Sequence, residues 1–176
     1  LEILKSINSS SKWEHLKSQG KVLWGDARNK IFAVPKSIHF DLIFHDAFSP
    51  NKCPQLWSEE FLFNLVEKLA PGGRLITYSS SAAIRASLKR AGLEIYSTIP
   101  VDKNDNRWSN GTIGILPDQN QSSYSHSANW HPLTKMEQEH LLTNAAVPFR
   151  DPHGNASSKE ILEHRTKEQQ ISNLSN

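Results

Sequence analysis

A carboxylate, an aromatic ring and a proline follow one another in the segment HDAFSP (residues 45–50), directly after the apolar run FDLIF (residues 40–44). Such a run is typical of a strand that is covered on both faces, as in a parallel sheet. Asp46 would then stand at the carboxyl end of a strand, where open α/β sheets bind their ligands. The alternative is that Asp46 only caps a turn, since Asp, Ser and Pro are common turn residues.

The elements that would position Asp46 alternate between strand and helix. We expect strands at residues 22–24, 40–44, 74–80, 93–99 and 111–116. We expect helices over residues 1–19, closed by Gly20, from Ser58 to the Pro71-Gly72-Gly73 break, and from Ser81 to Gly92. This alternation predicts a wound α/β sheet, and the last two strands predict an antiparallel hairpin.

Composition excludes several classes of protein. The chain has 176 residues and no run near the roughly 20 apolar residues that cross a bilayer, so we expect one domain and no membrane partner. Cys53 is the single cysteine, which excludes an internal disulfide and favours a reducing, cytoplasmic location. The eight histidines show no metal-ligand spacing, so we expect no metal. A net charge of +2 neither requires nor excludes a nucleic acid.

Composition also changes along the chain. Residues 117–132 are polar and low in aliphatic side chains, which predicts a linker between residues 1–116 and a charged C-terminal extension, residues 133–176. Within this extension, residues 140–152 contain apolar side chains that would pack back onto the sheet. The remainder predicts a solvated helix or a disordered tail.

Four segments carry a resemblance to a known family: GDAR (residues 25–28), DAFSPNKCPQLW (46–57), LAPGGRLITYSSSAAIRASLKRAGL (69–93) and NRWSNGTIGIL (106–116). They resemble class I S-adenosylmethionine-dependent methyltransferases. The second is similar to the motif of the methyltransferase domain in the bifunctional protein that makes 5-methylaminomethyl-2-thiouridine in tRNA, and of its stand-alone relatives.

The resemblance implies a Rossmann-like class I methyltransferase sheet that ends in an antiparallel hairpin. From the resemblance we expect the first strands of that fold, with the glycine-rich cofactor loop, to be missing from this chain, which begins at Leu1. The implied activity is methyl transfer from S-adenosyl-L-methionine to the aminomethyl group of a modified wobble uridine. The implied partners are tRNA and an FAD-dependent oxidoreductase that acts on the same tRNA position.

The resemblance also assigns a catalytic and a cofactor-binding role. Asp46 would be the catalytic residue, since a carboxylate can orient the substrate amine and accept its proton. Asp26 would accept a hydrogen bond from the adenine amino group, with Ala27 close to the adenine ring. The alternative for Asp26 is a turn residue at the end of a strand.

Five further residues would bind the substrate. An aromatic side chain is a suitable platform for a flipped or single-stranded base. For Trp57, packing in the core is an equal alternative. Tyr78 either lines the substrate pocket or only packs against its neighbours. The residues are Phe48, Ser49, Pro50, Trp57 and Tyr78.

Two other functions stay open on the sequence: methylation of a small-molecule or protein amine, and a truncated, non-catalytic methyltransferase fold that acts as a binding module. A basic cluster of Arg85, Lys89 and Arg90 would favour tRNA, because cationic side chains bind a nucleic-acid backbone. A solvated helix face explains the same charges.

Overall fold

The computed structural model describes residues 2–99, 111–120 and 129–174, which form two compact units, Leu1–Pro35 and Lys36–Asn176. Each unit is described by itself. The beginning of the last family-like motif, residues 106–110, and residues 121–128 of the predicted linker lie outside the described residues. Among the described helices, none has the length and apolar character that a membrane span requires.

The first unit contains a helix, a hairpin and two short helical turns. Its elements are α1 (Glu2–Ser10), β1 (Lys12–His15), β2 (Ser18–Lys21), α2 (Ala27–Lys30) and η1 (Ile31–Ala33). The prediction of one helix over residues 1–19 is correct for α1 and wrong beyond Ser10. The predicted strand at residues 22–24 is also wrong, because the strand in this region ends at Lys21.

Backbone conformation explains why the first helix stops. Ser11 and Leu16 have φ values of 58° and 53°, which place them in the left-handed region that breaks a helix. Trp13 then lies opposite Gly20 across the β1–β2 pair. A Cβ atom at Gly20 would come within 2.1 Å of the Trp13 indole nitrogen. Gly20 therefore makes room for a cross-strand tryptophan and does not close a helix.

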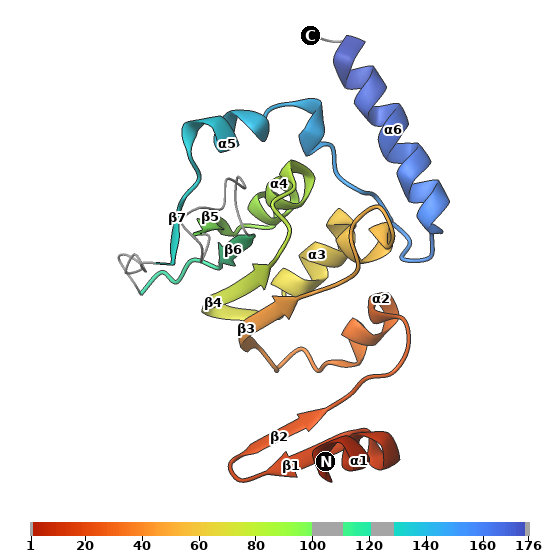
Figure 1. The fold of residues 1–176 in the computed structure, drawn as a ribbon, viewed down its shortest axis with the longest axis vertical. Helices are drawn as coiled ribbons and strands as arrows, with labels where there is room; N and C mark the ends of the chain where they lie inside the picture. The colour runs from red at the N-terminus through yellow and green to blue at the C-terminus, as the bar shows by residue number, and fades with distance from the viewer. Residues whose placement is uncertain (1, 100–110, 121–128, 175–176) are drawn as a thin grey trace. The chain divides into compact units, whose positions relative to one another are not determined.

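The second unit is a mixed sheet with helices packed against it (Figure 1). Its elements are β3 (Phe40–His45), η2 (Pro54–Trp57), α3 (Glu59–Val66), β4 (Leu69–Thr77), α4 (Ala82–Arg90), β5 (Glu94–Thr98), β6 (Thr112–Ile115), β7 (Trp130–Pro132), α5 (Lys135–His140), η3 (Asn144–Ala146) and α6 (Ser158–Leu174). The strand order is β3-β4-β6-β5-β7. Only β3 and β4 are parallel among these neighbours, and β5 and β6 form the predicted antiparallel hairpin. The predicted α/β sheet is confirmed.

Helices α3 and α4 supply the main core of this unit. Ser58 caps α3 as predicted, since its hydroxyl accepts a hydrogen bond from the Phe61 amide. The apolar faces of both helices meet the sheet, and Leu62, Leu75 and Leu88 are completely buried between them. Burial of such a side chain contributes about 1.5–3 kcal/mol to stability, so this layer fixes the helices to β4.

The Pro-Gly-Gly segment lies inside a strand. Helix α3 ends at Val66, and β4 begins at Leu69 and runs through Gly72 and Gly73, so the prediction that the helix continues to this segment is wrong. Gly72 has a φ of 77°, and a Cβ atom at Gly73 would lie 2.9 Å from the Phe40 carbonyl oxygen. Gly73 therefore allows the close approach of β3 and β4, and Gly72 adopts a positive φ that other residues rarely adopt.

Strand β3 is covered on one face only. Phe40, Leu42 and Phe44 are 39%, 44% and 71% exposed, whereas Ile43 packs against the core and His45 is buried. The prediction of a strand covered on both faces is therefore wrong for the described residues. The reason is that the described core packs on the inward face, where His45 contacts the Trp57 and Phe61 rings, whereas Phe40, Leu42 and Phe44 alternate with these inward residues.

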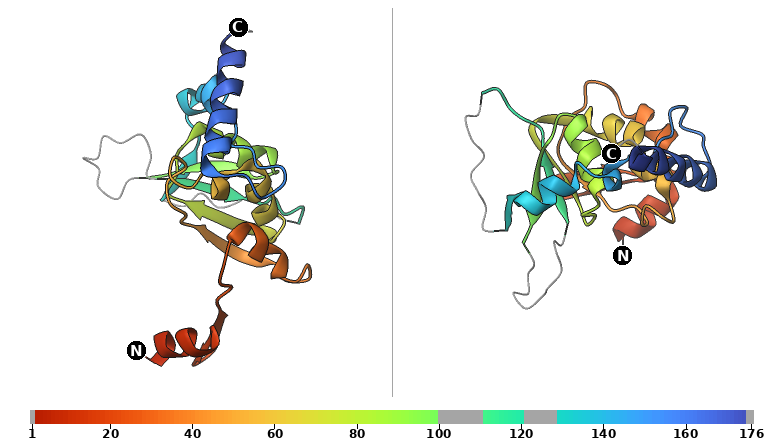
Figure 2. Two further views of the ribbon diagram at one scale, coloured as in Figure 1. Left: turned by 90° about the vertical axis from the view of Figure 1, so that its right-hand side faces the viewer. Right: turned by 90° about the horizontal axis from the view of Figure 1, so that it is seen from above.

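The C-terminal extension packs onto the helical layer. Phe149 and Ile161 are 3% and 1% exposed and belong to the same core cluster as Trp57. The Phe149 carbonyl oxygen accepts the Glu59 amide at 2.9 Å, and the Arg150 side chain donates to Glu60 at 2.6 Å. α5 and α6 thus lie on the same side of the sheet as α3 and α4 (Figure 2). The domain boundaries at residues 116 and 132 stay predictions, but residues 130–132 pair with β5.

Candidate functional site

Asp46 and Tyr78 follow the ends of two neighbouring parallel strands. β3 ends at His45 and β4 ends at Thr77, and these two residues are paired in the sheet. The carboxyl ends of parallel strands meet at one edge, so Asp46 and Tyr78 emerge at the same place. The Asp46 side chain is exposed there, as a residue that meets a ligand from solution must be.

The segment after β3, residues 46–50, is named the site loop here. Two consecutive carbonyl groups of this loop accept hydrogen bonds from side chains. The Tyr78 hydroxyl donates to the Ala47 oxygen at 2.9 Å, and the Trp57 indole N–H donates to the Phe48 oxygen at 2.6 Å. The Ser49 carbonyl oxygen accepts the amides of Lys52 and Cys53 at 2.8 and 2.9 Å. The loop is therefore held along most of its length.

The predicted substrate residues differ in how much surface they offer. Phe48 is 79% exposed, and Ser49 and Pro50 are half-buried beside it. Tyr78 is 46% exposed, although its hydroxyl is engaged with the loop. Trp57 is completely buried and packs edge-on against the Tyr78 ring at 5.8 Å. An aromatic ring as exposed as that of Phe48 is available to stack on a planar ligand.

Asp26 lies in the first unit, where it caps α2. Its carboxylate accepts the Arg28 amide at 2.9 Å and forms an ion pair with the Arg28 guanidinium at 2.7 Å. The hydrogen bonds from Arg28 hold the pKa of Asp26 below its ordinary value. A carboxylate has about four acceptor positions, and the Asp26 side chain is 39% exposed. Arg28 alone directs four hydrogen bonds at these positions, from its amide, from Nε to both oxygens and from Nη2, so a further donor would have to replace one of them. Ala27 lies next to Asp26 at the start of α2.

His45 is a residue of this site that the sequence interpretation missed. Its side chain is 7% exposed and contacts the Trp57 ring edge-on, with ring centroids 4.4 Å apart. Burial lowers the pKa of His45 to about 4, against smaller opposing effects of the Leu56 backbone and the Asp46 carboxylate. The imidazole is therefore neutral near pH 7. The period-two alternation of β3 is the signal that could have identified it, because His45 shares the inward face with Ile43.

The titration of His45 predicts a loss of stability in mild acid. The folded pKa of about 4 lies below the unfolded value of 6.5, so the unfolded state binds more protons between these limits. The free energy of unfolding should fall as pH decreases from 6.5 to about 4, by up to roughly 3 kcal/mol. We expect His45→Phe to remove this contribution in urea unfolding measured across the pH range.

His153→Phe is the matched control, because His153 is exposed and lies far along the chain from this packing. The free energy of unfolding of His153→Phe should keep the pH dependence of the parent protein. An unchanged slope in His45→Phe would show that His45 is not the group responsible.

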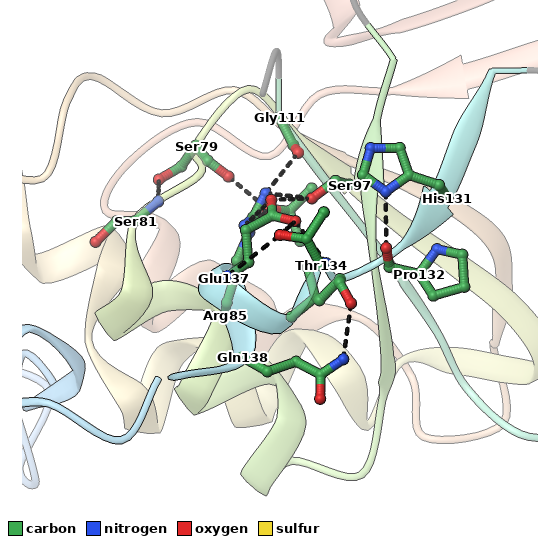
Figure 3. Close-up of polar contacts among 12 residues, drawn as sticks. Ser79, Ser81, Arg85, Ser97, Gly111, His131, Pro132, Thr134, Glu137 and Gln138 are labelled. Carbon is green, nitrogen blue, oxygen red and sulfur yellow. Dashed lines mark hydrogen bonds and ion pairs between the residues drawn. The ribbon is translucent and has the colours of Figure 1, made fainter. Parts of the chain in front are cut away.

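The predicted basic cluster does not exist as a surface. Arg85 is 1% exposed, and its guanidinium forms an ion pair with Glu137 at 2.8 Å (Figure 3). The same group donates to Ser97 and Thr112, each at 2.9 Å. The interpretation of Arg85 as a tRNA contact is therefore wrong. The physical reason is that α5, far along the chain, brings a carboxylate over the inner face of α4.

Arg90 and Lys89 are the other two residues of the predicted basic cluster. The Arg90 guanidinium forms an ion pair with Glu59 at the start of α3, so its charge is partly neutralised. Lys89 is exposed at the end of α4. One exposed lysine and one paired arginine make a weak electrostatic footprint for a polyanion.

Glu137 is held in its charged form. Burial by itself would raise the pKa of Glu137, but hydrogen bonds from Ser97, from the Thr134 backbone and from Arg85 outweigh burial and lower the pKa to about 2. The Thr134 side chain also closes a capping box with Glu137 at the start of α5. The pair thus links α4, the β5–β6 hairpin and α5 through one buried charge cluster.

The chain is similar to a family model and to several known proteins. A family model described as S-adenosyl-L-methionine-dependent methyltransferase matches residues 2–107. An uncharacterized protein of Methanocaldococcus jannaschii is 37% identical over 71 residues, which are 40% of this chain and 19% of that protein.

Two further relatives carry the name tRNA 5-methylaminomethyl-2-thiouridine biosynthesis bifunctional protein MnmC. The protein of Caulobacter sp. (strain K31) is 38% identical over 55 residues, 31% of this chain and 9% of its own length. The protein of Pseudomonas fluorescens (strain Pf0-1) is 32% identical over 77 residues, 44% of this chain and 11% of its own length.

A solved structure, that of MNMC2 from Aquifex aeolicus, is similar over most of the chain. The TM-score is 0.75 and the identity 31%, over 93% of this chain and 48% of the solved one. The chain therefore spans about half the length of this structural relative and at most 19% of the three curated relatives.

Proposed function

The chain belongs to the S-adenosyl-L-methionine-dependent methyltransferase family, and from this premise we propose that it methylates the aminomethyl nitrogen of a modified wobble uridine in tRNA. The observation that carries the proposal is the site loop. It presents a carboxylate, Asp46, two residues from a 79% exposed aromatic ring, Phe48, at the carboxyl edge of the sheet. The likeness to MnmC relatives supports tRNA as the substrate class.

In the proposed reaction the protein forms no covalent bond to either reactant. S-adenosyl-L-methionine, when bound, supplies a methyl group on a positively charged sulfur. In the transfer the amine nitrogen would gain the methyl group, the cofactor would leave as a neutral thioether, and the amine would release one proton. Asp46 accepts a hydrogen bond from the amine, aims its lone pair and takes up the proton. Holding both reactants in line can supply up to about 7–11 kcal/mol of the barrier reduction.

The other site residues would bind and orient the two reactants. We propose that the Phe48 ring stacks on the target base, and that Ser49 and Pro50 shape the wall beside it. Asp26 would accept the adenine amino group of the cofactor, with Ala27 against the ring. These roles fit side chains that are at least partly exposed in the structure.

The setting of the proposed reaction follows from its substrate. We expect tRNA as the partner macromolecule, and an FAD-dependent oxidoreductase that acts earlier at the same tRNA position and supplies the free aminomethyl group. A cytoplasmic location is consistent with both partners.

A second candidate function is methylation of a different amine, on a small molecule or a protein. The burial of Arg85 favours this alternative, because it removes the centre of the basic cluster that would have contacted the tRNA backbone. The chemistry of Asp46 would be the same, and only the acceptor would change.

Transfer of labelled methyl from S-adenosyl-L-methionine to under-methylated tRNA tests the proposal. With the full-length protein, we expect the label in the wobble nucleoside after digestion and chromatography. tRNA whose wobble uridine lacks the aminomethyl group is the matched control and should stay unlabelled. Label in another nucleoside, or none in tRNA despite measurable cofactor binding, would contradict the tRNA assignment, and label in small amines would support the second candidate.

A further inference from the structure

Two consecutive peptide groups of the site loop are each held by one aromatic side chain from a different element. Tyr78, just after β4, donates to the Ala47 carbonyl, and Trp57, at the end of η2, donates to the Phe48 carbonyl. The donor and acceptor residues are 31 and 9 positions apart in the sequence. The loop is thus connected to both neighbouring elements at adjacent points.

The geometry of the backbone gives these two bonds a specific effect. Each peptide group is planar, so fixing its carbonyl restricts the whole plane. The Ala47 and Phe48 carbonyls belong to the two planes that flank the Phe48 Cα atom. Restricting both planes therefore fixes the direction in which the Phe48 ring leaves the backbone. Asp46 lies between the end of β3 and the first of these planes, so its direction is restricted as well.

Both donors are themselves well supported. The Trp57 ring is completely buried between His45 at 4.4 Å and Tyr78 at 5.8 Å, so the indole cannot turn away from the loop. Burial and, second, the negative charge of Asp46 raise the pKa of Tyr78. The Tyr78 hydroxyl therefore keeps its proton and remains a donor near the Asp46 carboxylate.

We propose that Trp57 and Tyr78 are positioning residues, which clamp the Ala47 and Phe48 carbonyls and so set the directions of the Asp46 carboxylate and the Phe48 ring. This role replaces direct substrate contact for Trp57, whose ring has no exposed surface. It rests on the proposed function for its catalytic consequence, but the clamp itself is a property of the loop without substrate.

Tyr78→Phe is the sharpest test, because it deletes one hydroxyl and keeps the ring that packs against Trp57. We expect kcat for methyl transfer to fall about 10- to 100-fold, with the KM for S-adenosyl-L-methionine unchanged, since misplacement of a reacting group by about 1 Å has effects of this size. Tyr96→Phe is the matched control, because it deletes a hydroxyl that donates to Glu94 on β5 at 3.1 Å. The control should leave both constants unchanged.

Hydrogen exchange separates this inference from the proposed function, because it requires no substrate. In Tyr78→Phe we expect the amides of residues 46–49 and 51–53 to exchange about 5-fold faster than in the parent protein, and in Tyr96→Phe at the parent rate. Unchanged exchange in Tyr78→Phe would overturn the clamp. Faster exchange in a protein that transfers no methyl to tRNA would keep the clamp and overturn only the function. Faster exchange with an unchanged kcat in an active enzyme would overturn the positioning role.

Discussion

Asp46→Asn is expected to lower kcat for methyl transfer by about 10²- to 10⁴-fold, which is the usual contribution of a positioned acid–base group. Asparagine keeps the size and shape of the side chain but removes the negative charge that accepts the proton of the amine. Its NH₂ group also offers a donor where the substrate amine needs an acceptor. Because Asp46 is exposed, the free energy of unfolding should change by less than about 0.5 kcal/mol.

Asp41→Asn is the control for this substitution, because Asp41 is an exposed aspartate on β3, the strand that Asp46 follows. Steady-state kinetics should show parental kcat for the control and unchanged cofactor binding in both variants. A parental kcat in Asp46→Asn would remove Asp46 from the reaction. A loss of cofactor binding in Asp46→Asn would instead move its role from the substrate amine to the cofactor.

Glu137→Ala is expected to destabilise the protein by about 3–5 kcal/mol, because it leaves the buried Arg85 charge without its counter-charge. Such a loss is a large part of the 5–15 kcal/mol that stabilises a typical domain. Urea unfolding at pH 7 measures the effect. Glu137→Gln should lose less, since its amide oxygen can still accept from Arg85. The difference between Glu137→Gln and the parent should shrink as pH falls from 4.5 to about 2, where the carboxylate becomes protonated.

Glu139→Ala is the matched control on the same helix. Glu139 is exposed and lies 3.8 Å from Lys135, and such a surface pair contributes at most about 1 kcal/mol. An equal, small effect of both alanine variants would show that the Arg85–Glu137 pair does not hold α5 in place. Loss of activity in an Arg85 variant must be compared with its stability before it is attributed to tRNA binding.

The local part of the fold could be predicted from the sequence. Ser58 followed by two acidic residues marks the start of α3, and the alternation in residues 93–99 marks β5, because these signals depend on neighbours within one or two turns. The end of α1 after Ser10 depends on the positive φ of Ser11, a conformation that a serine side chain does not require. The prediction of a helix to residue 19 therefore runs past the actual end of α1.

The parts of the site that could not be predicted depend on contacts between residues that lie far apart in the sequence. The Asp46 carboxylate and its strand end follow from position and motif. The burial of Arg85 does not, because its carboxylate partner comes from α5, 52 residues later. The same holds for Trp57, whose role depends on where its indole N–H finds a carbonyl. A sequence gives the type of a side chain, but the partner of a buried polar atom is set by the tertiary structure.

The place of β6 between β4 and β5 has a consequence for how the chain acquires its structure during synthesis. The two strands that flank β6 are made before it, so β4 and β5 cannot complete the sheet until residues 112–115 have arrived. The counter-charge of the Arg85 guanidinium arrives later still, because Glu137 is synthesised 52 residues after Arg85. At about 5–20 residues per second, the ribosome leaves this arginine without its counter-charge for roughly 3–10 s. The nascent chain therefore cannot pair this buried charge before α5 emerges, and a pause in translation before residue 137 would prolong its exposure to aggregation and proteolysis.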